Sequence, residues 1–236
     1  MNILITGTSR GIGFEMVKYL TKEPGHKIIM VSRNSEKLNE LANYCKTEQP
    51  YAQIIPLVFD LSKTQSFQEL NALITDETDS IDVLINNAGY LINKPFSELS
   101  SSEVAQIYRV NILGPIELIK TCLPLLEKSE KAHVVNISSM GGFQGSVKFP
   151  GLATYASSKA ALASLTECLA EEYKESRIKF NCLALGAVAT EMLAEAFPGY
   201  EAPTTAQEMG KFIADFALSG HHFFNGKILP VSQSTP

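Results

Sequence analysis

Short apolar runs alternate along the chain with longer segments in which apolar residues recur every three or four positions. The short runs predict strands at Asn2–Thr6, Lys27–Ser32, Gln53–Phe59, Asp82–Asn86, Ala132–Ile137, Ile178–Ala184 and Lys227–Val231. The longer segments predict helices over residues 12–22, 35–47, 63–78, 100–128, 153–176 and 205–218. The third, fourth and fifth runs are almost continuous in Val, Ile and Leu, which is typical of strands covered on both faces.

This regular alternation predicts an α/β fold with a doubly wound parallel sheet, helices on both faces and right-handed crossovers. We find no linker, internal repeat or low-complexity tract, so we expect residues 1–236 to form one domain. The segment 191–204 contains Pro198, Gly199 and Pro203. We expect it to be the most mobile part of the chain and to act as a substrate loop.

The composition is that of a globular protein, with 45% hydrophobic and 19% charged residues. A net charge of −5 makes nucleic acid and anionic membranes improbable partners. No apolar run approaches the roughly 18 residues of a membrane span, and residues 1–7 lack the features of a signal peptide. We therefore expect a cytoplasmic protein. The spacing of its histidines and cysteines predicts no metal site.

A glycine-rich loop, Thr6–Gly13, follows the first predicted strand and leads into a helix. Glycines allow a backbone to approach a pyrophosphate closely, and the unpaired N–H groups of the helix favour an anion. The spacing is GxxxGxG and not the commoner GxGxxG. We expect the loop to bind a dinucleotide through Gly7, Ser9, Arg10, Gly11, Ile12 and Gly13.

The same loop also matches a second motif. Gly7-Thr8-Ser9-Arg10-Gly11 has the G-x-S-x-G spacing of a hydrolase nucleophile elbow, and His221 and His222 follow later in the chain. Only six residues precede Gly7, so no earlier strand and loop are present to supply the second oxyanion donor. We therefore favour dinucleotide binding.

The end of the second predicted strand bears on the choice of cofactor. A site selective for NAD places a carboxylate here to bind the ribose hydroxyls. This chain has Ser32 and Arg33 instead, and Arg10 adds a positive charge in the glycine loop. The absence of an acid and the presence of two bases predict NADP(H), with a 2′-phosphate contact from Arg33.

Tyr155 and Lys159 are four residues apart in a predicted helix and therefore share one face of it. A phenol with a pKa of about 10 is a poor base at neutral pH. A neighbouring ammonium group stabilises the phenolate and lowers that pKa, which makes the tyrosine usable in acid–base chemistry.

With these residues, the chain resembles the short-chain dehydrogenase/reductase family over nearly its whole length. The resemblance rests on Thr6–Gly13, Asp60-Leu61, Asn86-Asn87-Ala88-Gly89, Asn111, and Ser138-Ser139 followed by Tyr155-x-x-x-Lys159. It implies a Rossmann fold of seven strands in the order 3-2-1-4-5-6-7. It also implies reversible hydride transfer between a nicotinamide and a carbonyl or alcohol.

The resemblance also implies a role for each matching residue. Tyr155 is the general acid/base, Lys159 binds the nicotinamide ribose and lowers the tyrosine pKa, and Ser139, rather than Ser138, binds the substrate oxygen. Asn111 holds a water of the proton relay. The remaining cofactor contacts are Asp60 and Leu61 at the adenine, Asn87, Ala88 and Gly89 along the cofactor, and Val188 and Thr190 at the carboxamide. A homodimer or homotetramer through the 100–128 and 153–176 helices is implied as well.

Three features depart from the family pattern. Tyr155 lies 16 residues after Ser139, so the loop 141–151 is longer than usual and is placed to line the substrate pocket. The usual Pro-Gly after the sixth strand is Leu185-Gly186. The sequence after Pro230 lacks the Asp-Gly-Gly that often ends the seventh strand, so we expect different C-terminal contacts.

These features predict an NADP(H)-dependent carbonyl reductase that acts on a ketone or aldehyde with Tyr155 as proton donor. One alternative is an NAD-dependent alcohol oxidation by the same site. The other is a catalytically idle NADP-binding regulatory or interaction protein, for which the complete set Asn111, Ser139, Tyr155 and Lys159 would have no physical purpose. We expect the substrate to be chosen by residues in the segments 90–97, 141–152 and 191–204.

Pro115 lies inside the predicted helix 100–128, where it removes an N–H group and crowds the carbonyl of Asn111, four residues before it. We therefore expect the Asn111 carbonyl to lack its helical partner and the helix to bend there. A carbonyl freed in this way would be able to hold the relay water.

Overall fold

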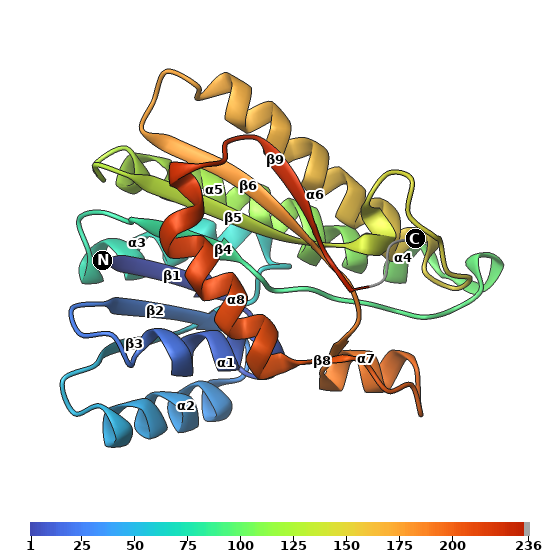
Figure 1. The fold of residues 1–236 in the computed structure, drawn as a ribbon, viewed down its shortest axis with the longest axis horizontal. Coiled ribbons are helices and arrows are strands. Elements are labelled where there is room, and N and C mark those ends of the chain that lie inside the picture. Colours follow the sequence, from blue (N-terminus) through green and yellow to red (C-terminus); the bar gives the residue numbers. More distant parts are fainter. Residues whose placement is uncertain (234–236) are drawn as a thin grey trace.

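Seven parallel strands form a central sheet in the computed structural model, which describes residues 1–233 (Figure 1). They are β1 (Asn2–Thr6), β2 (Lys27–Ser32), β3 (Gln53–Val58), β4 (Val83–Asn86), β5 (Ala132–Ser139), β6 (Ile178–Leu185) and β9 (Lys227–Val231). Their spatial order is β3-β2-β1-β4-β5-β6-β9. The predicted order 3-2-1-4-5-6-7 is confirmed, with β9 as the seventh strand. The last three residues of the C-terminal segment, 234–236, lie outside the described range.

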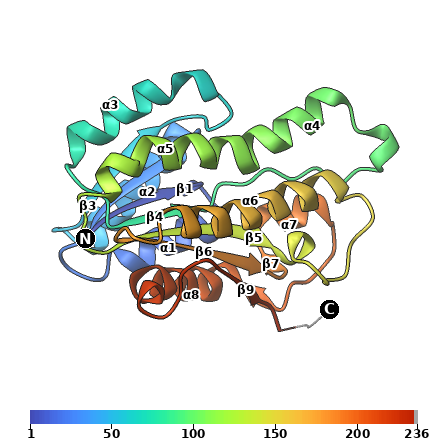
Figure 2. The same cartoon turned by 90° about the horizontal axis from the view of Figure 1, so that it is seen from above.

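Helices cover both faces of this sheet (Figure 2). One face carries α1 (Gly11–Leu20), α2 (Ser35–Glu48) and α8 (Ala206–Ser219), and the other carries α3 (Phe67–Glu77), α5 (Gly114–Leu126) and α6 (Ala153–Glu172). α4 (Ser101–Tyr108) precedes α5, and short 3-10 turns occupy Thr64–Ser66, Phe96–Glu98, Met140–Gly142 and Gly220–His222. None of the helices within residues 1–233 is long and apolar enough to cross a membrane.

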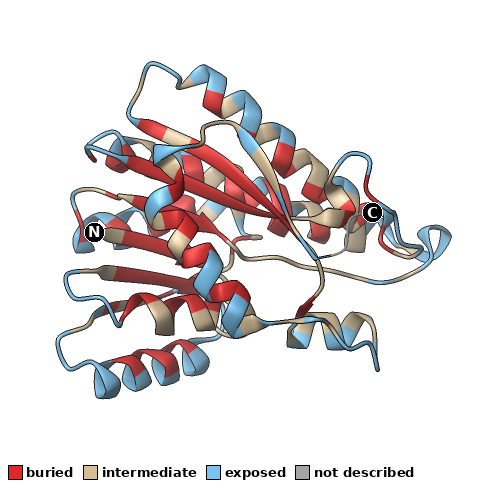
Figure 3. Cartoon of the chain, in the orientation of Figure 1, coloured by how far each residue is buried: buried red, intermediate tan, exposed pale blue. Residues whose placement is uncertain are grey.

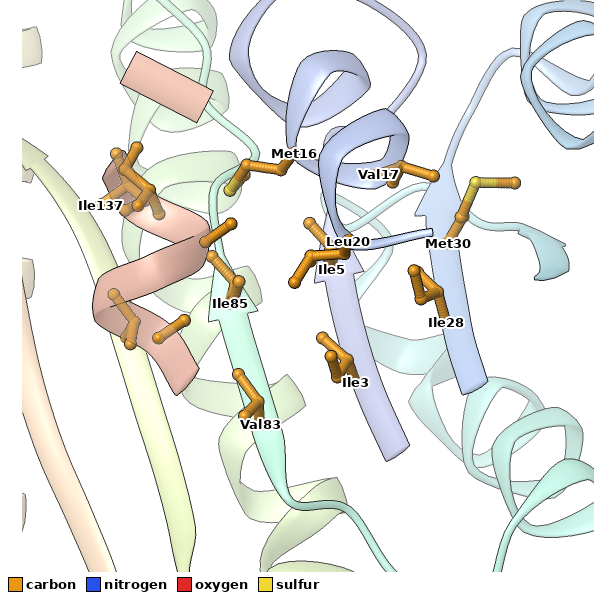
Figure 4. Packing of buried hydrophobic residues seen from close by; sticks show 14 of the residues in the cluster. Ile3, Ile5, Met16, Val17, Leu20, Ile28, Met30, Val83, Ile85 and Ile137 are labelled. Atoms are coloured by element: carbon orange, nitrogen blue, oxygen red, sulfur yellow. The ribbon is translucent and has the colours of Figure 1, made fainter. Parts of the chain in front are cut away.

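Side chains alternate between two hydrophobic cores because successive residues of a strand point to opposite faces. Ile3 and Ile5 of β1 lie in the core beneath α1, α2 and α8, whereas Leu4 lies in the core beneath α3 and α5. Figure 4 shows Ile3 and Ile5 with Met16 and Leu20 of α1 in the first of these cores. The central strands are therefore buried on both faces (Figure 3), as their continuous apolar runs predicted.

The predicted helix 100–128 is interrupted at Asn111. A five-residue π-helical turn, Arg109–Leu113, separates α4 from α5, and the N–H of Gly114 donates to the carbonyl of Arg109. Pro115 then lies in the first turn of α5, where its missing N–H costs little. The expected single helix with a bend at Asn111 is instead two α-helices joined by a wide turn that contains Asn111.

The segment 191–204 contains more regular structure than its prolines and glycine indicated. It begins with a short helix, α7 (Glu191–Ala196), whose N-cap is Thr190. β7 (Val188–Ala189) and β8 (Thr204–Thr205) pair in parallel around it. A helix of six residues is too short to reveal an apolar period in sequence.

His133 of β5 is fully buried and forms hydrogen bonds through both ring nitrogens. Its Nδ1 lies 2.9 Å from the carbonyl oxygen of Ala217, and its Nε2 lies 3.0 Å from Nδ2 of Asn181. The Asn181 amide cannot turn over, because it also donates to the carbonyl of Phe224 and accepts from the N–H of Lys227. His133 is therefore held as the neutral tautomer with its proton on Nδ1. Burial lowers the pKa of His133 to about 4.

We expect acid to destabilise the fold through His133. Its pKa is about 6.5 in the unfolded chain, so stability from this group is complete above pH 6.5 and falls as the pH drops toward 4. Between pH 7 and pH 5 this contribution should lower the free energy of unfolding by about 2 kcal/mol. Urea unfolding of the wild type and of His133→Gln at both pH values measures it. An equal loss of stability in the two proteins would contradict this prediction.

Candidate active site

The predicted site residues gather at the edge of the sheet where its parallel strands end. The glycine loop follows β1, the segment from Asn87 follows β4, Ser139 ends β5, and Val188 follows β6. All of these connections lie toward one end of the molecule, on the same side as α7 (Figure 1). In open α/β sheets this edge is where ligands bind.

The glycine loop and the turn after β4 are packed backbone against backbone. Gly7 has a φ of +72°, and a Cβ on it would lie 2.7 Å from the Cα of Ala88. A Cβ on Gly13 would lie 2.2 Å from the carbonyl oxygen of Gly7. Nδ2 of Asn87 donates to the carbonyls of Thr6 and Gly7, at 2.9 and 3.2 Å. Glycine at positions 7 and 13 is therefore required for this contact.

Thr6 contributes to the same contact. Its hydroxyl oxygen accepts hydrogen bonds from the N–H groups of Asn87 and Ala88, at 3.1 and 3.0 Å. Thr6 is not among the cofactor contacts predicted from the sequence. Its only signal was a hydroxyl side chain at the end of an otherwise apolar strand.

The glycine loop fits a pyrophosphate. Arg10 is the N-cap of α1 but provides no side-chain cap, so the first N–H groups of the helix are not capped by a side chain. The hydroxyl of Thr8 is buried and has no hydrogen-bond partner in the described part of the chain. A cleft of about 940 Å³ is lined by Ser9, Arg10 and Gly11 on one side and by Thr190 and other residues of 189–206 on the other. This volume lies in the range of small-molecule sites.

The other predicted cofactor residues lie around this region in varied environments. The carboxylate of Asp60 accepts from the N–H of Ser62 at 3.0 Å, and Leu61 is buried against Gly114. Ile12 packs against the core beneath α1, Val188 is buried, and Arg33 is exposed at the end of β2.

Arg10 makes an ion pair that the sequence did not predict. Its guanidinium donates two hydrogen bonds to the carboxylate of Glu195 in α7, at 2.5 and 3.2 Å. This hydrogen bonding raises the pKa of Arg10 and lowers the pKa of Glu195. The pair joins the glycine loop to α7 across the edge of the cleft. The positive charge of Arg10 is therefore balanced by the carboxylate of Glu195.

Ser138 and Ser139 have different roles at the end of β5. The hydroxyl of Ser138 is buried and donates to the carbonyl of Lys159 at 2.8 Å, so it joins β5 to α6. The hydroxyl oxygen of Ser139 accepts from the N–H of Gly141 at 3.2 Å, and hydrogen bonding from Ser139 lowers the pKa of Tyr155. Ser139 is thus the serine that faces the phenol, and its contact with a substrate oxygen stays a prediction.

The ammonium group of Lys159 is almost fully buried. It donates to the carbonyl of Ile137 at 2.7 Å and lies 6.0 Å from the centre of the Tyr155 ring. Burial lowers the pKa of Lys159 to about 8. A Cβ on Gly89 would lie 3.6 Å from this ammonium nitrogen, so the turn after β4 reaches α6.

Burial raises the pKa of Tyr155 to about 12, and its hydrogen bond with Ser139 opposes this only in part. The sequence had led us to expect a lowered pKa from Lys159. In this structure the Lys159 ammonium is engaged by Ile137, and desolvation of the phenolate dominates. Tyr155 is therefore a protonated phenol at neutral pH.

The side chain of Asn111 is buried and fully engaged. Its Oδ1 accepts from the N–H of Tyr90 at 2.7 Å, and its Nδ2 donates to the carbonyl of Tyr90 and to the hydroxyl of Ser158, each at 2.9 Å. Asn111 thus connects the segment after β4 to α6. Because both amide hydrogens are used, a relay water would have to bind the backbone carbonyl, which stays a prediction.

A smaller pocket of about 220 Å³ lies between the segment after β4 and α7. Its lining consists of Leu91, Ile92, Asn93, Met192, Glu195 and Ala196. A Cβ on Gly89 would lie 3.9 Å from the terminal methyl of Met192 and 3.6 Å from the ammonium nitrogen of Lys159, so the pocket adjoins Lys159. The sequence predicted these two segments, but not the individual residues that meet.

The sequence model of the short chain dehydrogenase family matches residues 1–201. The chain belongs to this family. Members are oxidoreductases that act on alcohol and carbonyl groups with a nicotinamide cofactor, so the recognition from motifs is confirmed. The short-chain dehydrogenase fold also appears in a crystal structure from Escherichia coli CFT073, solved in complex with NADPH. That structure has a TM-score of 0.88 and 29% identity, and the match covers 97% of this chain and 95% of the other.

Among short-chain dehydrogenases of known name, the ketoacyl reductase HetN of Nostoc is 33% identical over 187 residues. The match covers 79% of this chain but only 63% of HetN. A fatty acyl-CoA reductase of Acinetobacter baylyi is 29% identical over 217 residues, which cover 91% of this chain and 72% of that enzyme.

We expect Glu195→Gln to strengthen the binding of NADPH about two- to fivefold, because the carboxylate competes with the 2′-phosphate for Arg10. The gain should shrink as salt rises, and NADH binding should change little. Fluorescence titration of both cofactors measures the effect. Glu201→Gln is a matched control, since Glu201 lines the same cleft but makes no ion pair with Arg10. Equal gains in both variants would contradict a specific competition.

Proposed function

We propose that the protein is an NADP(H)-dependent reductase that converts a ketone or aldehyde to an alcohol, with Tyr155 as proton donor. The observation that carries this proposal is the position of the half-buried Tyr155 phenol beside Ser139, with the Lys159 ammonium nitrogen 6.0 Å from the centre of its ring. A reduction needs a proton for the developing alkoxide, and a phenol with a pKa of about 12 holds one at any physiological pH.

Four residues would each have a separate role in the reduction: Ser139, Tyr155, Lys159 and Asn111. A bound nicotinamide cofactor supplies the hydride for the carbonyl carbon. Ser139 donates a hydrogen bond to the substrate oxygen and stabilises its negative charge, and Tyr155 delivers the proton to the same oxygen. Lys159, with a pKa of about 8, is positively charged near neutral pH and favours return of a proton to Tyr155. The backbone carbonyl of Asn111 would hold the water of that relay.

Several features support NADP(H) over NAD(H). β2 ends without a carboxylate, and Arg33 is exposed beyond it with no ion-pair partner among residues 1–233. Arg10 supplies a second cation in the glycine loop, for the 2′-phosphate that NADH lacks. The similar Escherichia coli structure was solved with NADPH.

The names of the relatives support reduction as the direction. Both the ketoacyl reductase and the fatty acyl-CoA reductase are named for the reduction of a carbonyl group. We propose that Leu91, Ile92 and Met192 contact the substrate next to its carbonyl, and that the loop 141–151 lines the other side.

Assembly and location stay predictions. We propose a homodimer or homotetramer through the adjacent surfaces of residues 100–128 and 153–176. The hydroxyls of Tyr108 and Ser157 already join these helices at 2.9 Å, and Leu113 is 44% exposed beside them. A cytoplasmic location remains the expectation from the sequence.

Two alternatives would be distinguished by kinetics. An NAD-dependent alcohol oxidase would show faster turnover with NAD and alcohols than with NADPH and carbonyls. An idle NADP-binding protein would bind NADPH but consume none in a broad screen of ketones and aldehydes.

We expect Tyr155→Phe to retain NADPH binding and to lose about 10²-fold or more in kcat, since the ring remains but the transferable proton is lost. Steady-state reduction and a cofactor titration measure the two effects. Tyr44→Phe, which changes a half-exposed phenol on α2, is the control and should keep normal turnover. Near-native turnover of Tyr155→Phe would exclude Tyr155 as the acid.

We expect Arg33→Ala to weaken NADPH binding at least about tenfold and to leave NADH binding nearly unchanged, because it removes a charge-assisted contact to the 2′-phosphate. Arg177→Ala, at the opposite end of the sheet, controls for the loss of a surface charge. If Arg33→Ala weakens both cofactors equally, Arg33 supports the loop and does not recognise the phosphate.

A further inference from the structure

The long loop between β5 and α6 is folded around the ammonium group of Lys148. This group donates to the carbonyl of Gly141 at 2.9 Å, to the carbonyl of Phe143 at 2.6 Å and to the hydroxyl of Ser146 at 2.8 Å. All three ammonium hydrogens are therefore used. The Lys148 side chain is exposed, but Gly141 and Ser146 are buried. The hydroxyl of Ser146 also donates to the carbonyls of Met140 and Phe143, so the acceptors form one connected set.

The other side of the same turn contacts both the end of β5, at Ser139, and α6, which carries Tyr155. The N–H of Gly141 donates to the hydroxyl oxygen of Ser139 at 3.2 Å. A Cβ on Gly142 would lie 2.6 Å from the backbone nitrogen of Ala160 and 2.8 Å from the carbonyl carbon of Lys159, so this turn lies directly against α6. Residues 140–142 thus contact both Ser139 and α6, the helix that carries Tyr155.

The hydrogen bond from Gly141 orients the Ser139 hydroxyl. When its oxygen accepts from Gly141, the hydroxyl hydrogen is free to point toward Tyr155 and a substrate oxygen. Hydrogen bonding from Ser139 lowers the pKa of Tyr155, which agrees with this orientation. If the turn moved, Ser139 would lose the hydrogen bond from Gly141 that orients its hydroxyl group. The distance between Ser139 and α6 would also change.

We propose that Lys148 is a positioning residue, which fixes the 140–146 turn and thereby orients Ser139 toward the substrate oxygen. This inference rests on the proposed function. It assigns a purpose to the added loop length: the loop supplies a cation that holds the carbonyls on either side of Gly142. Gly145, at a φ of +82°, lets the chain reverse so that Lys148 returns to the turn.

The test compares Lys148→Met with Lys148→Arg and with Lys128→Met, an exposed lysine at the end of α5. We expect Lys148→Met to lower kcat about tenfold with little change in KM or NADPH affinity, because small displacements of catalytic groups reduce turnover. Lys148→Arg should restore most of the rate, and Lys128→Met should be unaffected. A Lys148→Met enzyme with native kcat would overturn the proposal.

A double-mutant cycle with Ser139→Ala tests whether Lys148 acts through Ser139. In the Ser139→Ala background, Lys148→Met should cause almost no further loss of kcat. An equal loss in both backgrounds would show a general structural effect and would overturn the proposal.

Amide hydrogen exchange separates this proposal from the proposed function. Exchange in residues 140–146 should be faster in Lys148→Met than in the wild type, and should recover in Lys148→Arg. Unchanged exchange overturns the role of Lys148 whatever the activity. A wild type that reduces no carbonyl in the broad screen contradicts the proposed function instead.

Discussion

The ammonium group of Lys159 is buried at the end of β5, with the carbonyl of Ile137 as its hydrogen-bond partner. A buried charge is costly unless polar groups surround it, so the protein must bring several backbones close to this point. Ser138 ties the carbonyl of Lys159 to β5, and Gly142 brings the next turn against the same residue. Gly89 brings the segment after β4 to the ammonium itself. Each of these approaches depends on a small side chain or on none.

The same packing supports the proposed role of Tyr155 as proton donor. Burial disfavours both charged forms, so it lowers the pKa of Lys159 to about 8 and raises the pKa of Tyr155 to about 12. The phenol keeps its proton. The pKa of Lys159 is close enough to neutral pH for its ammonium group to exchange a proton. A substrate alkoxide formed beside Ser139 would be a stronger base than the phenolate, so transfer from Tyr155 to it is favourable.

Much of this architecture was readable from local patterns. The uninterrupted apolar runs predicted a parallel sheet, because strands that are buried on both faces have no polar positions. Pro115 predicted a departure from regular helix at Asn111, because proline removes a backbone N–H group. The motif residues were found because their chemistry depends on spacing along one helix or one turn. The Arg10–Glu195 ion pair and the hydrogen bonds of Lys148 were not predicted. Each joins residues through a loop conformation, and no periodicity in the sequence encodes that conformation.

α7 connects the two halves of the site. Its residues Glu191, Leu193 and Ala194 line the large cleft beside the glycine loop, whereas Met192, Glu195 and Ala196 line the small pocket near Lys159. Glu195 also reaches back to Arg10, and the carbonyl of Ala196 accepts from the side chain of Asn93 at 2.8 Å. Both contacts hold the C-terminal end of α7, so a displacement of this end would change the cleft and the pocket together. α7 therefore provides a physical connection between the cleft and the pocket, and the Arg10–Glu195 ion pair lies at the point where this connection meets the glycine loop.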